Sequence, residues 1–153
     1  MHKHYIAHLD ISLTNLLTDY MGRCAYIDYE LSRRFESTDP THLVYNYRGT
    51  ELPPESGKDT PIDPYKVDVW ALAVLFLRSC KVCLQIIFIL VTYSSTLQLT
   101  GFWVPQLMHI IKPMLDEDPS RRPSSFAVLQ AFDKLIVSIG LQTETEADRG
   151  CYD

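Results

Sequence analysis

The feature that most constrains this chain is a set of three oxygen-bearing side chains at fixed spacing. Asp10 and Asn15 lie five positions apart, and Asp28 follows thirteen positions after Asn15. Each of them lies beside a short apolar run, which predicts loops between short strands. Carboxylate and amide oxygens are ligands of Mg²⁺, and a carboxylate can also accept a proton from a hydroxyl. Taken singly, these residue types favour turns, so it is their spacing as a set that argues for a site.

With the residues around them, these side chains resemble the catalytic motifs of the eukaryotic protein kinase family. The triplet that ends at Asp10, together with Asn15, is similar to H-R-D-x-x-x-x-N, and the triplet that begins at Asp28 is similar to D-F-G. The resemblance implies that Asp10 accepts the proton of a substrate hydroxyl and that Asn15 and Asp28 bind Mg²⁺ against the phosphates of ATP. It also implies that His8 supports the site.

Several positions depart from the family's pattern, and three of these departures bear most on catalysis. Leu9 replaces the arginine of the catalytic loop, and Ser12 stands where Ser/Thr kinases carry a lysine that meets the γ-phosphate. Glu30 replaces the glycine of D-F-G, which adds a carboxylate beside the metal position and removes the residue best suited to a positive φ. These departures count against catalysis.

Further matches follow downstream in the family's order. The polar segment 29–55 resembles the activation segment, and it ends at Glu55 in Pro-Pro-Glu, which is similar to A-P-E. Asp68 and Trp70 match the D-x-W of the central helix, which implies that Asp68 accepts hydrogen bonds from catalytic-loop amides. The turn around Arg122 resembles D-P-x-x-R-P and implies a buried bridge to Glu55. The residue types alone would allow a solvated acid at Asp68 and a surface arginine at Arg122.

The apolar patterning predicts a fold that is mainly α-helical with a few short β-strands. We expect helices over residues 65–75 and 104–115 and a last helix capped by Ser124. We expect residues 1–7 to be the end of a helix and residues 8–28 to hold short strands. The apolar face of the last helix is expected to comprise Phe126, Leu129, Phe132, Leu135 and Ile136.

The resemblance covers the C-terminal lobe of the kinase fold and implies that the N-terminal lobe is missing. We therefore expect residues 1–140 to form a truncated protein kinase domain and residues 141–153 to be a disordered tail. The uncharged, β-branched segment 82–100 does not fit the family. Two interpretations stay open: a divergent buried helix or strand, or a retained intron, since Val82-Cys83 can be encoded by GTATGT, a common start of fungal introns. Its apolar core is shorter than the about 20 residues that span a bilayer.

Composition limits the classes of partner. The net charge is −5 and no basic stripe is present, which argues against nucleic acid and against an acidic membrane surface. Four cysteines in 153 residues indicate a reducing, intracellular setting, with cytoplasm and nucleus not distinguished. The Cys80–Cys83 pair lacks the second pair that a zinc site needs. We expect His2 and His4 to be solvated terminal residues.

Three interpretations of function follow. By resemblance, the chain belongs to an enzyme that transfers a phosphoryl group from ATP, with Mg²⁺, to a Ser or Thr hydroxyl of a protein. These 153 residues hold no counterpart of the glycine-rich loop that covers ATP, so we expect the isolated stretch to be inactive. The alternatives are a pseudokinase-type module that binds a protein partner, and a truncated or mis-spliced product without activity.

Overall fold

The computed structural model describes residues 1–21, 23–36, 42–57, 60–93 and 103–138. Within them, three α-helices account for most of the regular structure, and four short strands form two small antiparallel sheets. This confirms the expected mainly helical class with a few short strands. The described elements, in chain order, are η1 (His2–His4), β1 (Ile6–Ala7), η2 (Leu13–Asn15), β2 (Leu16–Thr18), β3 (Cys24–Tyr26), β4 (Arg33–Arg34), η3 (Pro54–Gly57), α1 (Pro64–Tyr93), α2 (Trp103–Met114), η4 (Pro119–Arg121) and α3 (Ser125–Ser138).

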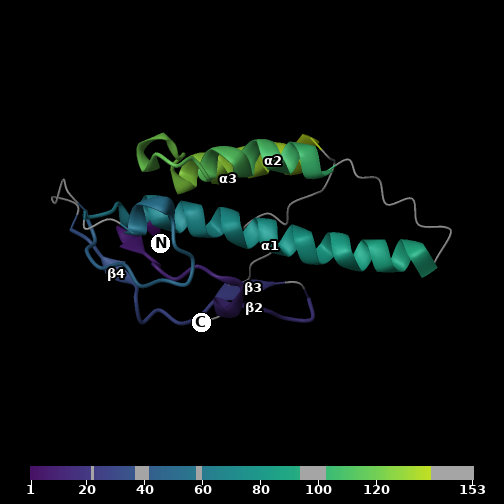
Figure 1. Ribbon diagram of the computed structural model, residues 1–153, viewed down its shortest axis with the longest axis horizontal. Coiled ribbons are helices and arrows are strands. Elements are labelled where there is room, and N and C mark those ends of the chain that lie inside the picture. The colour runs from purple at the N-terminus through teal and green to yellow at the C-terminus, as the bar shows by residue number, and fades with distance from the viewer. Residues whose placement is uncertain (22, 37–41, 58–59, 94–102, 139–153) are drawn as a thin grey trace, which may run out of the picture.

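The long helix α1 runs through the middle of the fold (Figure 1). Helices α2 and α3 lie side by side along one side of α1, and the strands and loops of the N-terminal part lie along the other side. Apolar residues of α1 therefore take part in all three core clusters. Val67 packs with Ala7 and Leu9 from the N-terminal part, while Val69 and its neighbours on α1 pack against Ile111 of α2.

Helix α1 begins where its sequence provides a cap. The Asp63 carboxylate accepts hydrogen bonds from the backbone N–H groups of Tyr65 (2.9 Å) and Lys66 (3.2 Å). Pro64 is the first helical residue. A backbone N–H at that position has no partner within the helix, so proline loses no hydrogen bond there. The cap fixes where the helix starts and thereby places Asp68, four residues into α1, beside the N-terminal loop.

The helix expected over residues 65–75 is present and is longer than predicted. It continues to Tyr93, 30 residues in all. Residues 82–93 of the unusual segment are therefore helical, and the strand alternative is wrong for them. Residues 94–100 of that segment lie outside the described residues, as does the tail 141–153.

One local expectation is wrong and a second is wrong in part. Residues 1–7 are not the end of a helix: one 3₁₀ turn, His2–His4, leads into strand β1, which pairs with β4. On α3, the side chains of Phe126 and Leu129 are exposed, and Val128 is the residue buried against α1 and α2. The Ser124 cap is present, because its hydroxyl accepts a hydrogen bond from the N–H of Ala127 at 3.2 Å.

The second sheet is a hairpin that lies next to the candidate site. Strands β2 and β3 pair antiparallel, with Leu16 opposite Tyr26 and Thr18 opposite Cys24. One step beyond the sheet, the N–H of Ile27 donates to the carbonyl oxygen of Asn15 at 3.0 Å. The hairpin thus holds the segment after Asn15 against the segment before Asp28.

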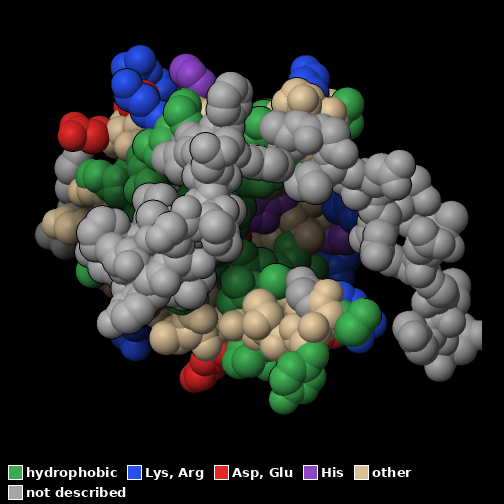
Figure 2. Space-filling view, turned by 90° about the vertical axis from the view of Figure 1, so that its right-hand side faces the viewer, with side chains coloured by type: hydrophobic (Ala, Val, Ile, Leu, Met, Phe, Trp, Pro, Cys, Tyr) green, Lys and Arg blue, Asp and Glu red, His purple; other side chains and the backbone are tan. Residues whose placement is uncertain are grey.

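Surface charge is dispersed on the face drawn in Figure 2. Lysine and arginine side chains lie at several separate points there, with apolar and acidic side chains between them. Among the described residues, no helix combines the length and the apolarity that crossing a bilayer requires.

Candidate functional site

A buried carboxylate on α1 fixes the loop that holds Asp10. Asp68 is 2% exposed, and its two oxygens accept hydrogen bonds from the backbone N–H groups of His8 (2.7 Å) and Leu9 (2.8 Å). Leu9 has a φ of 65°, a left-handed conformation that is uncommon for a bulky residue. The two bonds to an ionisable acceptor stabilise that conformation, so the expected contact between Asp68 and the loop is present.

His2 also belongs to this arrangement, and sequence reasoning missed it. Its Nε2 lies 2.8 Å from Oδ2 of Asp68, and its ring packs edge-on against Tyr65 at 4.9 Å between centroids. The expectation that His2 is a solvated terminal residue is therefore wrong. Nothing in its neighbouring residues signals the contact, because the partner lies 66 positions away.

The Asp10 carboxylate is held from two sides. The Asn15 side-chain amide donates to Oδ2 of Asp10 at 2.8 Å and to its carbonyl oxygen at 3.0 Å. The backbone N–H of Thr50 donates to Oδ1 at 2.7 Å. Asp10 and Asn15 are thus brought together as the sequence predicted. Thr50, 40 positions from Asp10, is a further contact that the spacing of the catalytic loop does not indicate.

These bonds set the charge of Asp10. Its partial burial by itself would raise the pKa, but the hydrogen bonds from Thr50 and Asn15 outweigh it and lower the pKa of the carboxyl below its ordinary value. Asp10 is therefore ionised at neutral pH. A carboxylate offers about four acceptor sites, so the bonds from Asn15 and Thr50 leave capacity for an incoming hydroxyl.

Asn15 is oriented by the same contacts. Both of its amide hydrogens have acceptors on Asp10, the carbonyl oxygen and Oδ2. The remaining polar group of the side chain is the carboxamide oxygen, which can only accept hydrogen bonds or bind a cation. These hydrogen bonds identify which atom of the Asn15 amide is nitrogen and which is oxygen. The oxygen is therefore the atom that is available to bind a cation.

The backbone of Asp28, not its side chain, is what connects it to the loop that holds Asn15. It follows Ile27, whose N–H is bonded to the Asn15 carbonyl, and it has a left-handed φ of 61°. Its exposed carboxylate accepts a long hydrogen bond, 3.4 Å, from the N–H of Glu30. Among the described residues no hydrogen bond joins Asp28 to Asp10 or to the Asn15 side chain, so Asp28 lies next to the pair without being fixed to it.

The donor set fits Mg²⁺ in chemical type. Mg²⁺ is usually bound through one or two carboxylates together with substrate phosphates, and Asp10, Asn15 and Asp28 provide two carboxylates and a carboxamide oxygen. No group of three or more His, Cys, Asp or Glu side chains able to hold a metal occurs in the part of the chain that the structure describes. A cation here would therefore depend on oxygens from a phosphate ligand to complete its coordination.

His8 supports the loop from its buried side. It is 1% exposed, and its Nδ1 accepts a hydrogen bond from the N–H of Asp10 at 3.3 Å. The ring packs against Tyr26 and Tyr29, with centroid distances of 5.3 Å and 5.0 Å. The Ser32 hydroxyl donates to the His8 carbonyl at 3.0 Å, which joins the segment after Asp28 to the loop.

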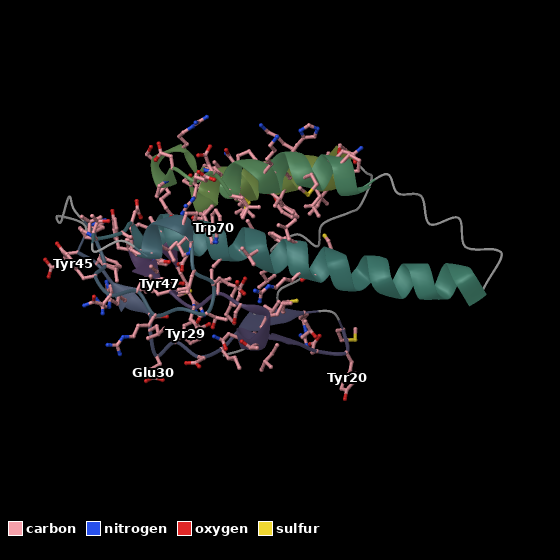
Figure 3. All side chains as sticks on the ribbon, viewed as in Figure 1. Tyr20, Tyr29, Glu30, Tyr45, Tyr47 and Trp70 are labelled. Carbon is pink, nitrogen blue, oxygen red and sulfur yellow. The ribbon has the colours of Figure 1, made fainter. Side chains whose placement is uncertain are left out.

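A buried ion pair joins η3, which contains Glu55, to the helical base. Nη1 and Nη2 of Arg122 each lie 2.7 Å from an oxygen of Glu55. The guanidinium also donates to the carbonyl oxygens of Asp116 (2.8 Å) and Lys66 (3.2 Å) and lies over the Trp70 ring at 4.8 Å. Trp70 projects from α1 toward the α2–α3 layer (Figure 3). The bridge expected between Arg122 and Glu55 is therefore present, with Trp70 as part of it.

The three departures from the family's pattern have distinct structural roles. Leu9 is buried in the apolar cluster with Ala7 and Val67. Ser12 is buried, and its hydroxyl shares a 2.8 Å hydrogen bond with that of Thr14. Glu30 is exposed and points away from the body of the fold (Figure 3), so it does not add a carboxylate to the pair formed by Asp10 and Asn15.

Glycine is required where the segment that carries Thr50 meets the loop. A Cβ on Gly49 would overlap the carbonyl oxygen of Leu9 and the hydroxyl of Tyr47. Tyr47 lies between α1 and the strands (Figure 3) and donates to the carbonyl of Glu51 at 3.1 Å. Its burial raises the pKa of the Tyr47 hydroxyl, which therefore stays protonated. The close approach of Gly49 is what allows Thr50 to reach Asp10.

Comparison with protein-family models and with curated proteins gives no match for this chain.

Proposed function

We propose that this chain carries the hydroxyl-orienting and metal-binding half of a protein-kinase-like phosphotransfer site, on a C-terminal lobe of that family's type. The reaction is transfer of the γ-phosphoryl group of ATP to a Ser or Thr hydroxyl of a protein. The observation that carries the proposal is the double hold on Asp10. The loop residue Asn15 and the distant Thr50 fix the two oxygens of one ionised carboxylate.

In this proposal the chain's own residues position the reactants. Asp10 accepts a hydrogen bond from the substrate hydroxyl and takes its proton as the new oxygen–phosphorus bond forms and the bond to ADP breaks. Its lowered pKa makes it a weak base, so its contribution is mainly orientation, in keeping with a reaction that depends on positioning and charge stabilisation. Asp68 and His8 keep the loop in shape through the bonds described above.

Asn15 and Asp28 are the residues that would hold Mg²⁺, which neutralises charge on the phosphates when it is bound. The Asn15 oxygen is oriented for this role because both amide hydrogens are used on Asp10. Asp28, whose carboxylate is exposed, is available to a cation at little cost in broken contacts. Because ATP is an intracellular substrate, the proposal also implies an intracellular setting.

A second candidate is a module that binds a protein partner without phosphotransfer. The observation that favours it is Ser12, which is buried and bonded to Thr14 where the family carries a lysine. The loop itself therefore provides no cation for the γ-phosphate. These 153 residues also hold no glycine-rich pattern, so the isolated stretch is expected to bind Mg·ATP weakly and to show little thermal shift with it.

The test is phosphoryl transfer by the natively expressed protein from γ-labelled ATP to a Ser/Thr protein substrate. Asp10→Asn is expected to lower the rate by about 10²–10⁴-fold, the usual contribution of a positioned acid–base group. Glu117→Gln, an exposed acid in the turn before η4, is the matched control and should leave the rate unchanged. Absence of transfer by the wild-type protein, or equal transfer by Asp10→Asn, contradicts the proposal and favours the binding module.

A further inference from the structure

An arginine on α1 lies beside the segment that contacts Asp10. Nη1 of Arg78 is 2.6 Å from Oε1 of Glu51, and this carboxylate is 5% exposed while the Arg78 side chain is 54% exposed. One nitrogen of the guanidinium thus lies against a buried acid, without the geometry of a hydrogen bond. A guanidinium has five N–H donors, so the exposed edge can bind a second acceptor in the planar geometry that carboxylates match.

The position of Arg78 relative to Asp10 follows from two contacts. Glu51 is the residue after Thr50, whose N–H is bonded to Asp10. On α1, Arg78 lies ten residues beyond Asp68, the acid that holds the Asp10 loop, and ten residues of α-helix span about 15 Å. An extended peptide covers that length in about four to five residues at about 3.3 Å each. Thr50, which contacts Asp10, and Glu51, which contacts Arg78, are neighbours in the chain. A protein segment whose hydroxyl reaches Asp10 can therefore reach Arg78 with a side chain a few residues away.

Other basic side chains lie near the same loop. Arg33 and Arg48 line a cavity of about 350 Å³ that Leu9, the neighbour of Asp10, also lines. The nearby acids Glu51, Glu55 and Asp68 are all buried, so their charges are turned inward. Arg33, Arg48 and Arg78 thus provide positive charge near the loop, beside the ionised Asp10 and the exposed acids Asp28 and Glu30.

We propose that Arg78 is a specificity-determining residue that binds an acidic side chain of the protein segment presented to Asp10. The inference rests on the proposed function and narrows its substrate class: the acceptor Ser or Thr lies within about five residues of an Asp or Glu, as the spacing along an extended chain requires. Glu51 orients the guanidinium, and Arg33 and Arg48 add attraction for an acidic segment.

The experiment measures binding of fluorescent peptides to the whole chain by anisotropy. The probes are a peptide with one central serine flanked by glutamates and a matched peptide with alanines in place of the glutamates. Wild type is expected to bind the glutamate peptide about tenfold more tightly, the effect of one good charge-assisted contact. Arg78→Gln is expected to reduce this preference to about twofold or less.

Two variants test whether Arg78 binds the peptide directly or acts only by neutralising the charge of Glu51. Glu51→Gln keeps the arginine and is expected to retain the preference for glutamate. The double variant Glu51→Gln with Arg78→Gln leaves no unpaired buried charge, so it should fold and lose the preference. Arg121→Gln is the control, since Arg121 is an exposed arginine paired with Asp116 at 3.4 Å, and it should change nothing.

Equal binding of the two peptides by wild type, or a preference that survives in the double variant, overturns the inference. Loss of the preference in Glu51→Gln overturns it as well, because Arg78 would then act only through the ion pair. Phosphoryl transfer by the natively expressed protein to both peptides is measured in parallel. Transfer that depends on Asp10 but shows no preference for glutamate contradicts this inference alone, and a preference without such transfer contradicts the proposed function alone.

Discussion

Replacing Glu55 with leucine removes one partner of an ion pair that is closed to solvent. The Arg122 side chain is 0% exposed. In the variant the Arg122 guanidinium still contacts the Trp70 ring and the carbonyl oxygens of Asp116 and Lys66, but its charge has no counter-ion. Breaking a buried pair on one side typically costs about 3–5 kcal/mol. For a chain of this size each kcal/mol lowers Tm by about 2–4 °C, so Glu55→Leu is expected to lower Tm by roughly 6–20 °C.

The assay is thermal and urea unfolding followed by circular dichroism. Replacing both partners, Glu55→Leu with Arg122→Met, removes the uncompensated charge and is expected to be less destabilising than Glu55→Leu alone. The exposed pair Asp19–Arg23 is the control, and Arg23→Ala, which keeps the backbone bonds to Asp19, should leave Tm nearly unchanged because solvent screens such pairs. A loss below about 1 kcal/mol for Glu55→Leu, or a double variant whose loss equals the sum of the single ones, would refute the reasoning.

Three further perturbations test the loop. Asp68→Asn weakens the charge-assisted bond to the N–H of Leu9 and should destabilise the fold by about 1.5–3 kcal/mol in urea unfolding; an unchanged midpoint would contradict the anchoring role. Gly49→Ala places a Cβ against the Leu9 carbonyl and should cost about 1–3 kcal/mol by the same measurement, whereas a neutral effect would show that the segment can move aside. The folded-state pKa of Asp10 is lowered from 3.8 by its bonds to Thr50 and Asn15, so its charge stabilises the fold above that pH and the contribution fades as the pH falls through the lower, folded-state value. Wild type should therefore lose its stability advantage over Asp10→Asn in acid, and a pH-independent difference would be inconsistent with this assignment.

The elements that sequence patterning located were those with strong local signals. The start of α1 was located to within one residue from the apolar run that begins at Val67, and the structure adds the Asp63 cap ahead of it. The hairpin strands were located from short apolar pairs. The end of α1 was not located, because the segment after residue 82 is β-branched and has no helical stripe, and propensity alone does not decide between helix and strand.

The buried face of α3 was misassigned for a related reason. Apolar residues occur on both faces of this helix, so its periodicity does not say which face packs. Phe126 and Leu129 fit the expected stripe but are exposed, whereas Val128 and Phe132 meet the core. Only the position of α1 and α2 decides between the faces.

The site residues were found through motif resemblance rather than through local physics. The pairing of Glu55 with Arg122 spans 67 positions, and no local rule connects them. The contacts of His2 with Asp68 and of Thr50 with Asp10 were missed because they span 66 and 40 positions. Their roles depend on the fold that brings the chain back to one loop.

The most direct test of the site is to determine which residues lie next to a bound cation. Mn²⁺, a paramagnetic substitute for Mg²⁺, broadens the NMR signals of nearby residues even when it binds weakly, so the whole chain can be titrated with Mn²⁺ and ATP. The account predicts selective broadening at Asp10, Asn15 and Asp28 that is lost in Asp28→Asn. Broadening centred instead on the acidic turn at residues 116–118, or broadening unchanged by Asp28→Asn, would contradict it.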